Sequence, residues 1–172
     1  MHSFLRIFRF WVPVFLWLVV IALESLFLSS NVTGSWIWKV LRMWHIPMSW
    51  NTFERFHHVL RKAGHVTGYG ILCVLAFRGW YRTWSVATVE QNTRLPRSSR
   101  QVRLQGAALA IGITLLTAIL DEWHQSFDPT RTASIRDVGL DLSGGVIFLS
   151  VALLVFRRWR ETAAGKLETA SV

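Results

Sequence analysis

The sequence predicts an all-α, polytopic membrane protein: a bundle of four transmembrane helices with an amphipathic, Trp-rich outer loop. Hydrophobic residues make up 52% of the chain and charged residues only 17%, a composition too apolar for an ordinary soluble domain. The 10 tryptophans and 11 phenylalanines suit the aromatic belts at membrane interfaces. Four apolar stretches approach or reach the length of about 20 residues that crosses a bilayer.

The first stretch, 10–28, follows two arginines but lacks a small-residue cleavage site. We therefore expect an uncleaved span rather than a signal peptide. The other three spans are expected at 63–81, 104–120 and 138–156. Together they form one transmembrane domain over 1–160, followed by a polar tail at 161–172 that we expect to be disordered.

The distribution of basic residues predicts that both termini are cytoplasmic. With the N-terminus inside, the cytoplasmic segments hold twelve Arg and Lys residues and the outer segments hold seven. This bias follows the positive-inside rule. No nucleic-acid motif accompanies the net charge of +9, so we attribute this charge to the loops and expect no nucleic-acid partner. The polar stretch 84–103 is expected to be a flexible cytoplasmic linker.

The outer loop, 29–62, interleaves aromatic and basic residues. Its aromatic side chains include Trp36, Trp38, Trp44, Trp50, Phe53 and Phe56. Such a pattern is typical of amphipathic segments that lie among lipid headgroups. A cap folded over the helix bundle is the alternative.

Ionisable and polar residues gather at the outer ends of the predicted spans. Such residues are costly within a membrane and are usually retained for function. They are Glu24 on the first span, Lys62, His65 and Tyr69 on the second, Asp121, Glu122, His124 and Gln125 on the third, and Asp137 and Asp141 on the fourth. Spacings of three, four and seven residues place those of the second and fourth spans on one helix face each, and Asp121, His124 and Gln125 on one face of the third. The sequence therefore predicts a polar pocket at the extracytoplasmic mouth of the bundle.

The short connection between the third and fourth spans carries a helix-start signal. Ser134 to Asp137 reads as a capping box that opens the fourth helix, so Asp137 is either a cap or part of the pocket. Asp141 lies one turn deeper and needs a partner. Lys62, His65 and Arg131 are the candidates.

Glycines on the second and fourth spans predict close helix packing. Gly64 and Gly68 form a small-xxx-small pattern, and Gly70, Gly144 and Gly145 lie nearby. Small residues let membrane helices approach closely. Cys73 lies in an apolar stretch and is expected to pack there.

Two motifs resemble the signatures of the VanZ-like family. The first is Lys62-x-x-His65-x-x-x-Tyr69-x-x-Leu72 at the head of the second span. The second is the run 121–131, from Asp-Glu-Trp-His-Gln to Pro-Thr-Arg, followed by Ser and Asp at 134 and 137.

The family pattern continues with Asn four residues after that Asp and Gly three residues later. This chain has Asp141 in place of the Asn and keeps Gly144, which makes the pocket more acidic. The resemblance covers about residues 10–156 and implies a bacterial polytopic protein of the cytoplasmic membrane. The family is named after a protein linked to low-level teicoplanin resistance, and membership implies no established reaction.

Binding is the first functional hypothesis. The pocket would engage a lipid-linked or amphiphilic ligand, such as a cell-wall precursor or a lipoglycopeptide, beside membrane lipid. The ligand-binding residues would be Glu24, Lys62, His65, Tyr69, Gln125, Arg131, Asp137 and Asp141. Arg131 suits bidentate contact with a phosphate or carboxylate.

A membrane enzyme is the second hypothesis. Asp121 or Glu122 with His124 would form an acid–base pair for phosphoryl or acyl transfer on a lipid-linked substrate. No nucleophile is marked, however, so the sequence leaves enzymatic activity open. A proton relay and a purely structural polar cluster remain further alternatives. We expect no cofactor and no metal, and the sequence does not predict an oligomeric state.

Overall fold

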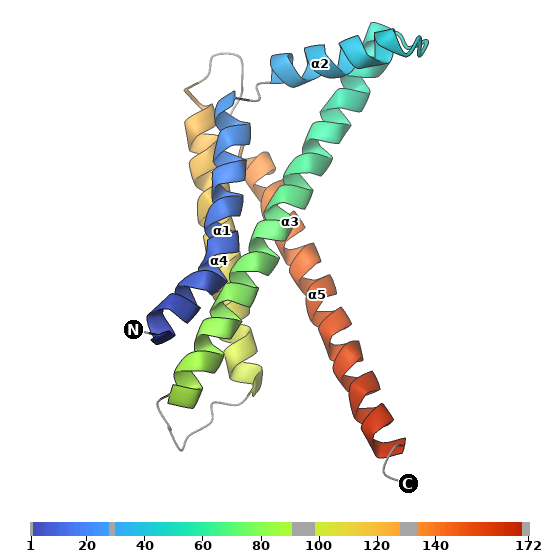
Figure 1. The fold of residues 1–172 in the computed structure, drawn as a ribbon. Helices are drawn as coiled ribbons and strands as arrows, with labels where there is room; N and C mark the ends of the chain where they lie inside the picture. Colours follow the sequence, from blue (N-terminus) through green and yellow to red (C-terminus); the bar gives the residue numbers. More distant parts are fainter. Residues whose placement is uncertain (1, 28–29, 91–98, 128–133, 170–172) are drawn as a thin grey trace.

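The computed structural model describes residues 2–27, 30–90, 99–127 and 134–169, and all regular secondary structure within them is α-helical. The helices are α1 (His2–Phe27), α2 (Ser30–Met43), α3 (Trp50–Glu90), α4 (Ser99–Gln125) and α5 (Ile135–Thr169). The four long helices run up and down the molecule in turn, and α2 lies across one end (Figure 1). The predicted all-α fold is confirmed.

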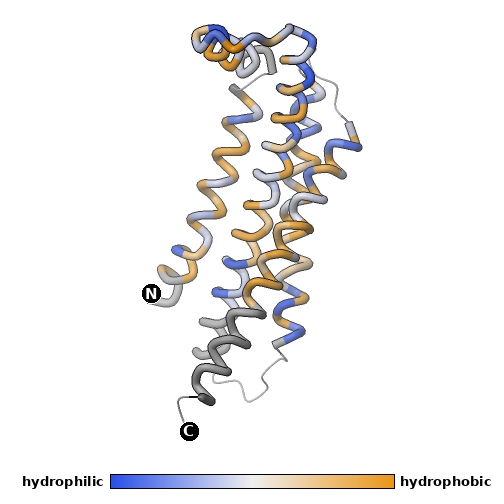
Figure 2. Tube along the Cα trace, turned by 90° about the vertical axis from the view of Figure 1, so that its right-hand side faces the viewer, coloured by the Kyte–Doolittle hydropathy of each residue, from blue (hydrophilic) through white to orange (hydrophobic). Residues whose placement is uncertain are grey.

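Three helices are long and apolar enough to cross a membrane: Ile7–Leu26 in α1, Arg100–Gln125 in α4 and Ile135–Phe156 in α5. They contain the third and fourth predicted spans and overlap the first at residues 10–26, so the chain is a multi-pass membrane protein. In Figure 2 the hydrophobic colour runs along the middle of the bundle, and hydrophilic residues concentrate toward its two ends. The predicted second span lies in α3, which is not one of these three helices.

α3 is the central helix of the bundle and packs against α1, α4 and α5. Its buried side chains include Tyr69, Leu72, Cys73 and Ala76, which confirms the expected packing of Cys73. A helix with neighbours on several sides can carry polar groups that those neighbours satisfy. This position explains why α3 is less apolar than the helices around it.

Two indole N–H groups hold α1 along α3. Trp17 Nε1 donates a 2.8 Å hydrogen bond to the backbone carbonyl of Gly68. Trp11 Nε1 donates one of 3.0 Å to the hydroxyl of Thr83. No ion pair joins α1 to α3 among the described side chains. These two bonds therefore give α1 a defined position and register.

Glycines bring α3 and α5 together at their crossing, as predicted for Gly70 and Gly144. A Cβ on Gly144 would collide with the backbone of Val66, and one on Gly70 would lie 2.5 Å from the ring of Phe148. The prediction was wrong for Gly64 and Gly68, where an added Cβ would meet nothing within 4 Å. Those two glycines line a cavity between α1, α2, α3 and α4 rather than a tight helix contact.

The helices extend beyond the expected spans in three regions of the chain. α3 begins at Trp50 rather than at residue 63, because Ser49 caps it: the Ser49 hydroxyl accepts the backbone N–H of Thr52 at 3.3 Å. α3 and α4 together also occupy 84–90 and 99–103, so much of the expected flexible linker is helical. α5 continues to Thr169, and most of the expected disordered tail is therefore helical.

Candidate functional site

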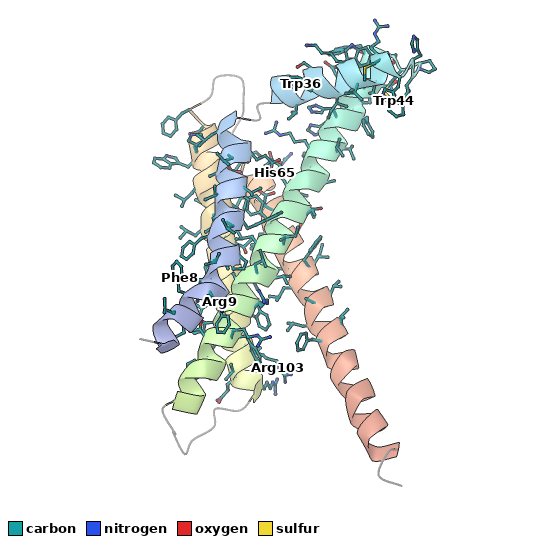
Figure 3. All side chains as sticks on the ribbon, viewed as in Figure 1. Phe8, Arg9, Trp36, Trp44, His65 and Arg103 are labelled. Atoms are coloured by element: carbon teal, nitrogen blue, oxygen red, sulfur yellow. The ribbon has the colours of Figure 1, made fainter. Side chains whose placement is uncertain are left out.

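A pocket of about 190 Å³ lies between α1, α2, α3 and α4, near the end of the bundle that carries α2. Figure 3 marks the level of this pocket with His65, beneath α2. The residues that line it are Ile21, Glu24, Ser25, Thr33, Ile37, His57, Leu60, Arg61, Gly64, His65, Gly68, Tyr69, Asp121 and Gln125. Apolar and charged side chains therefore share one small cavity.

Asp121 joins α3 and α4 on one side of this pocket. Its Oδ2 accepts hydrogen bonds from the hydroxyl of Tyr69 at 2.9 Å and from Nε2 of Gln125 at 3.0 Å. All three side chains are buried. These two hydrogen bonds fix the Asp121 carboxylate at the pocket wall and tie α4 to α3.

His65 connects the pocket to a buried carboxylate on α5. Its Nδ1 lies 3.5 Å from Oδ1 of Asp141, which is 1% exposed. Neither oxygen of Asp141 accepts a hydrogen bond from the described part of the chain. An unpaired buried carboxylate is costly, so a protonated His65 is the natural partner for Asp141. His65 was one of the three predicted candidates for this role.

Lys62 and Asp137 make a second contact between α3 and α5, nearer the surface. Lys62 Nζ lies 3.6 Å from Asp137 Oδ1, and the two side chains are 47% and 35% exposed. Exposed pairs of this kind contribute about 0–1 kcal/mol. The pair therefore contributes more to the alignment of α3 with α5 near the molecular surface than to the stability of the fold.

The start of α5 is capped differently from the predicted box. The Ser134 hydroxyl accepts the backbone N–H of Arg136 at 3.2 Å, as expected of an N-cap. The backbone N–H of Ser134 instead donates to Glu122 Oε2 on α4 at 2.8 Å. Glu122 thus fills the place that the sequence assigned to Asp137, because the end of α4 lies beside the start of α5. Asp137 is left to face Lys62.

Five predicted site residues line the pocket: Glu24, His65, Tyr69, Asp121 and Gln125. Four others lie around it through the contacts above: Lys62, Glu122, Asp137 and Asp141. His124 is exposed, and no contact with Asp121 or Glu122 is found among the described residues. Arg131 lies outside the described residues.

Sequence reasoning missed two basic residues of the pocket, His57 and Arg61, and its α2 wall of Thr33 and Ile37. His57, Arg61, Gly64 and Gly68 are spaced by three or four residues and follow one face of α3. This spacing indicates a shared helix face only if the helix begins well before residue 63, which the predicted span did not. His57 also lies 3.4 Å from the Thr33 hydroxyl, which ties α2 to the pocket.

The pocket brings a guanidinium and two imidazoles near two carboxylates. Within the described residues, no three His, Cys, Asp or Glu side chains gather in the manner of a metal site.

The chain was compared with known proteins. The sequence model of a family described as VanZ/LLP1 matches residues 10–157. No curated protein and no solved structure matches the chain. The matched region contains every pocket residue named above.

Proposed function

The chain belongs to the VanZ/LLP1 family, and from that premise we propose that it is a multi-pass protein of the bacterial cytoplasmic membrane that binds an amphiphilic ligand. The ligand would place its polar head in the pocket and its lipid portion along the bundle. The observation that carries this proposal is the pocket itself. It combines ionisable groups with apolar walls at the end of a bundle whose outer surface is apolar.

α3 is proposed as the fourth membrane crossing. It lies alongside α1, α4 and α5 and carries the chain back between α1 and α4. α1 and α4 run in the same direction and α3 runs opposite to both (Figure 1). If α1 and α4 cross the bilayer, the chain has to cross back between them, and α3 is the described helix that does so. The excess of basic residues at the opposite end then favours an extracytoplasmic pocket and cytoplasmic termini.

The side chains of the pocket indicate the ligand class. Arg61 presents a planar guanidinium that suits a phosphate or carboxylate. Ile21, Ile37 and Leu60 offer apolar contact. Glu24 and Asp121 can accept hydrogen bonds from hydroxyl, amide or amine groups. A lipid-linked cell-wall precursor or a lipoglycopeptide carries groups of these kinds, with Arg131 as a further proposed contact.

Binding is favoured over catalysis by the environment of the acid–base residues. Asp121 is held by Tyr69 and Gln125, and Glu122 caps α5. The His124 ring is exposed rather than directed at either carboxylate. The described contacts therefore assign these carboxylates to holding the pocket together.

Filling the pocket at Gly68 tests the proposal. A leucine there projects into space where a Cβ meets nothing, so Gly68→Leu occupies the cavity without a clash of its Cβ. Gly112→Leu is the matched control, because Gly112 on α4 is equally open but does not line the pocket. Native mass spectrometry in mild detergent, with an added polyprenyl phosphate, measures retained ligand.

We expect the wild type and Gly112→Leu to retain the polyprenyl phosphate, and Gly68→Leu and Arg61→Gln to lose it. Equal retention by a folded Gly68→Leu variant would contradict the pocket as the binding site. A wild type that keeps only bulk phospholipid would instead favour a purely structural polar cluster.

A further inference from the structure

α2 is attached to the rest of the molecule through α3 alone among the described helices. Its inner face carries Trp38, whose ring centroid lies 5.0 Å from that of Trp50 and 4.9 Å from that of Phe53. At its other end Thr33 faces His57. These contacts hold α2 crosswise at the end of the bundle (Figure 1).

The outer face of α2 is an apolar stripe. Trp36, Val40, Met43 and Trp44 are spaced four, seven and eight residues from the first, so they lie on one side of the helix. They are 66%, 49%, 68% and 72% exposed. Figure 3 labels Trp36 and Trp44 at the end of the molecule that carries α2.

Positive charge borders the stripe. Lys39 Nζ lies 5.7 Å from the centre of the Trp36 ring, and the Arg42 guanidinium lies 5.5 Å from that of Trp38. α2 contains no acidic residue. Basic residues beside exposed tryptophans are typical of a helix that lies in the headgroup layer of a membrane containing anionic lipid.

A cap folded over the bundle is less consistent with this geometry. A cap would bury its apolar stripe on the long helices, whereas this stripe faces away from α3. Ile46, Trp50 and Phe56 extend the exposed apolar surface. An apolar patch of this extent in water marks an interaction surface.

We propose that α2 is an interfacial helix that docks on anionic lipid. The stripe of Trp36, Val40, Met43 and Trp44 contacts the upper acyl chains, and Lys39 and Arg42 bind lipid phosphates. This proposal goes beyond ligand binding and does not depend on it. Because Thr33 and Ile37 of the same helix line the pocket, docking places the pocket mouth at the depth of the lipid headgroups.

Spin labels on the full chain in lipid nanodiscs test the docking. Single cysteines replace Val40 and Met43 on the stripe, and Leu116 on the exposed face of α4 serves as the lipid-depth reference. Cys73 is buried, and labelling of the unmodified protein measures its background. Power saturation compares collisions with oxygen, which is lipid-soluble, and with a water-soluble nickel chelate.

We expect labels at Val40 and Met43 to collide with oxygen more than with the nickel chelate, though less so than at Leu116. Collisions dominated by nickel would overturn the proposal, and shielding from both reagents would show a protein-covered cap instead. Raising the phosphatidylglycerol content should deepen the Val40 label in the wild type but not in a Lys39→Gln, Arg42→Gln variant. An equal response in both would overturn the assignment of anionic lipid as the partner.

Discussion

The contact between His65 and Asp141 leads to a prediction at the scale of single residues. Asp141 is buried, and His65 is the one cationic group within 4 Å of it among the described residues. Removing one partner of a buried pair costs about 3 kcal/mol, because it leaves an uncompensated charge. We therefore expect His65→Gln to lower the free energy of unfolding by about that amount.

Asp141→Asn is the matched change. It keeps the shape, removes the charge and lets His65 donate to a neutral amide, so we expect a loss of about 1 kcal/mol. Asn is also the residue that the family pattern carries there. Thermal or denaturant unfolding in detergent compares the two variants. A larger loss for Asp141→Asn would show that the carboxylate is stabilised by something other than His65.

The sequence predicted the shared helix face of Lys62, His65 and Tyr69, and each of these residues does meet a carboxylate from α4 or α5. Helical spacing and the cost of buried charge were sufficient for that. The open space at Gly64 and Gly68 could not be predicted, because a small-xxx-small pattern is the same at an interface and beside a cavity. Only the placement of neighbouring helices distinguishes them.

The start of α5 carries a prediction at the scale of the element. Glu122 accepts the backbone N–H of Ser134, while Asp137 makes a partly exposed pair with Lys62. Loss of a cap costs about 1 kcal/mol, whereas exposed pairs of this kind contribute about 0–1 kcal/mol and many contribute nothing measurable. Glu122→Ala should therefore destabilise the protein more than Asp137→Ala, as measured by unfolding in detergent.

If Asp137→Ala were instead the more destabilising of the two changes, the result would support the capping box that the sequence predicts, with Asp137 as its acidic member. Position within the chain could not decide between these carboxylates. Asp137 has the ideal spacing from Ser134, but Glu122 reaches the same backbone group from another helix. The start of α3 was missed for a related reason. The helix begins with polar turns capped by Ser49, and apolar runs alone do not reveal such turns.

At the scale of the whole molecule, composition alone was enough to predict a multi-pass membrane protein. Apolar runs specify α1, α4 and α5 because these helices turn much of their surface outward. α3 lacks that signal because polar residues and glycines interrupt its apolar run, among them Gly64, His65 and Gly68. Its role as a crossing therefore has to be argued from its direction and position in the bundle.

The number of crossings determines which loops share a side of the membrane. If α3 crosses, Asn51 at its start and Ser126 at the end of α4 lie on the same side; if it does not, they lie on opposite sides. Cysteines at these two positions should therefore both react with an impermeant thiol reagent in intact cells, since the pocket end is proposed to be extracytoplasmic. A cysteine at Arg100, at the other end of α4, should react only after lysis. Opposite labelling of Asn51 and Ser126 would remove α3 as a span, and labelling of both only after lysis would invert the orientation.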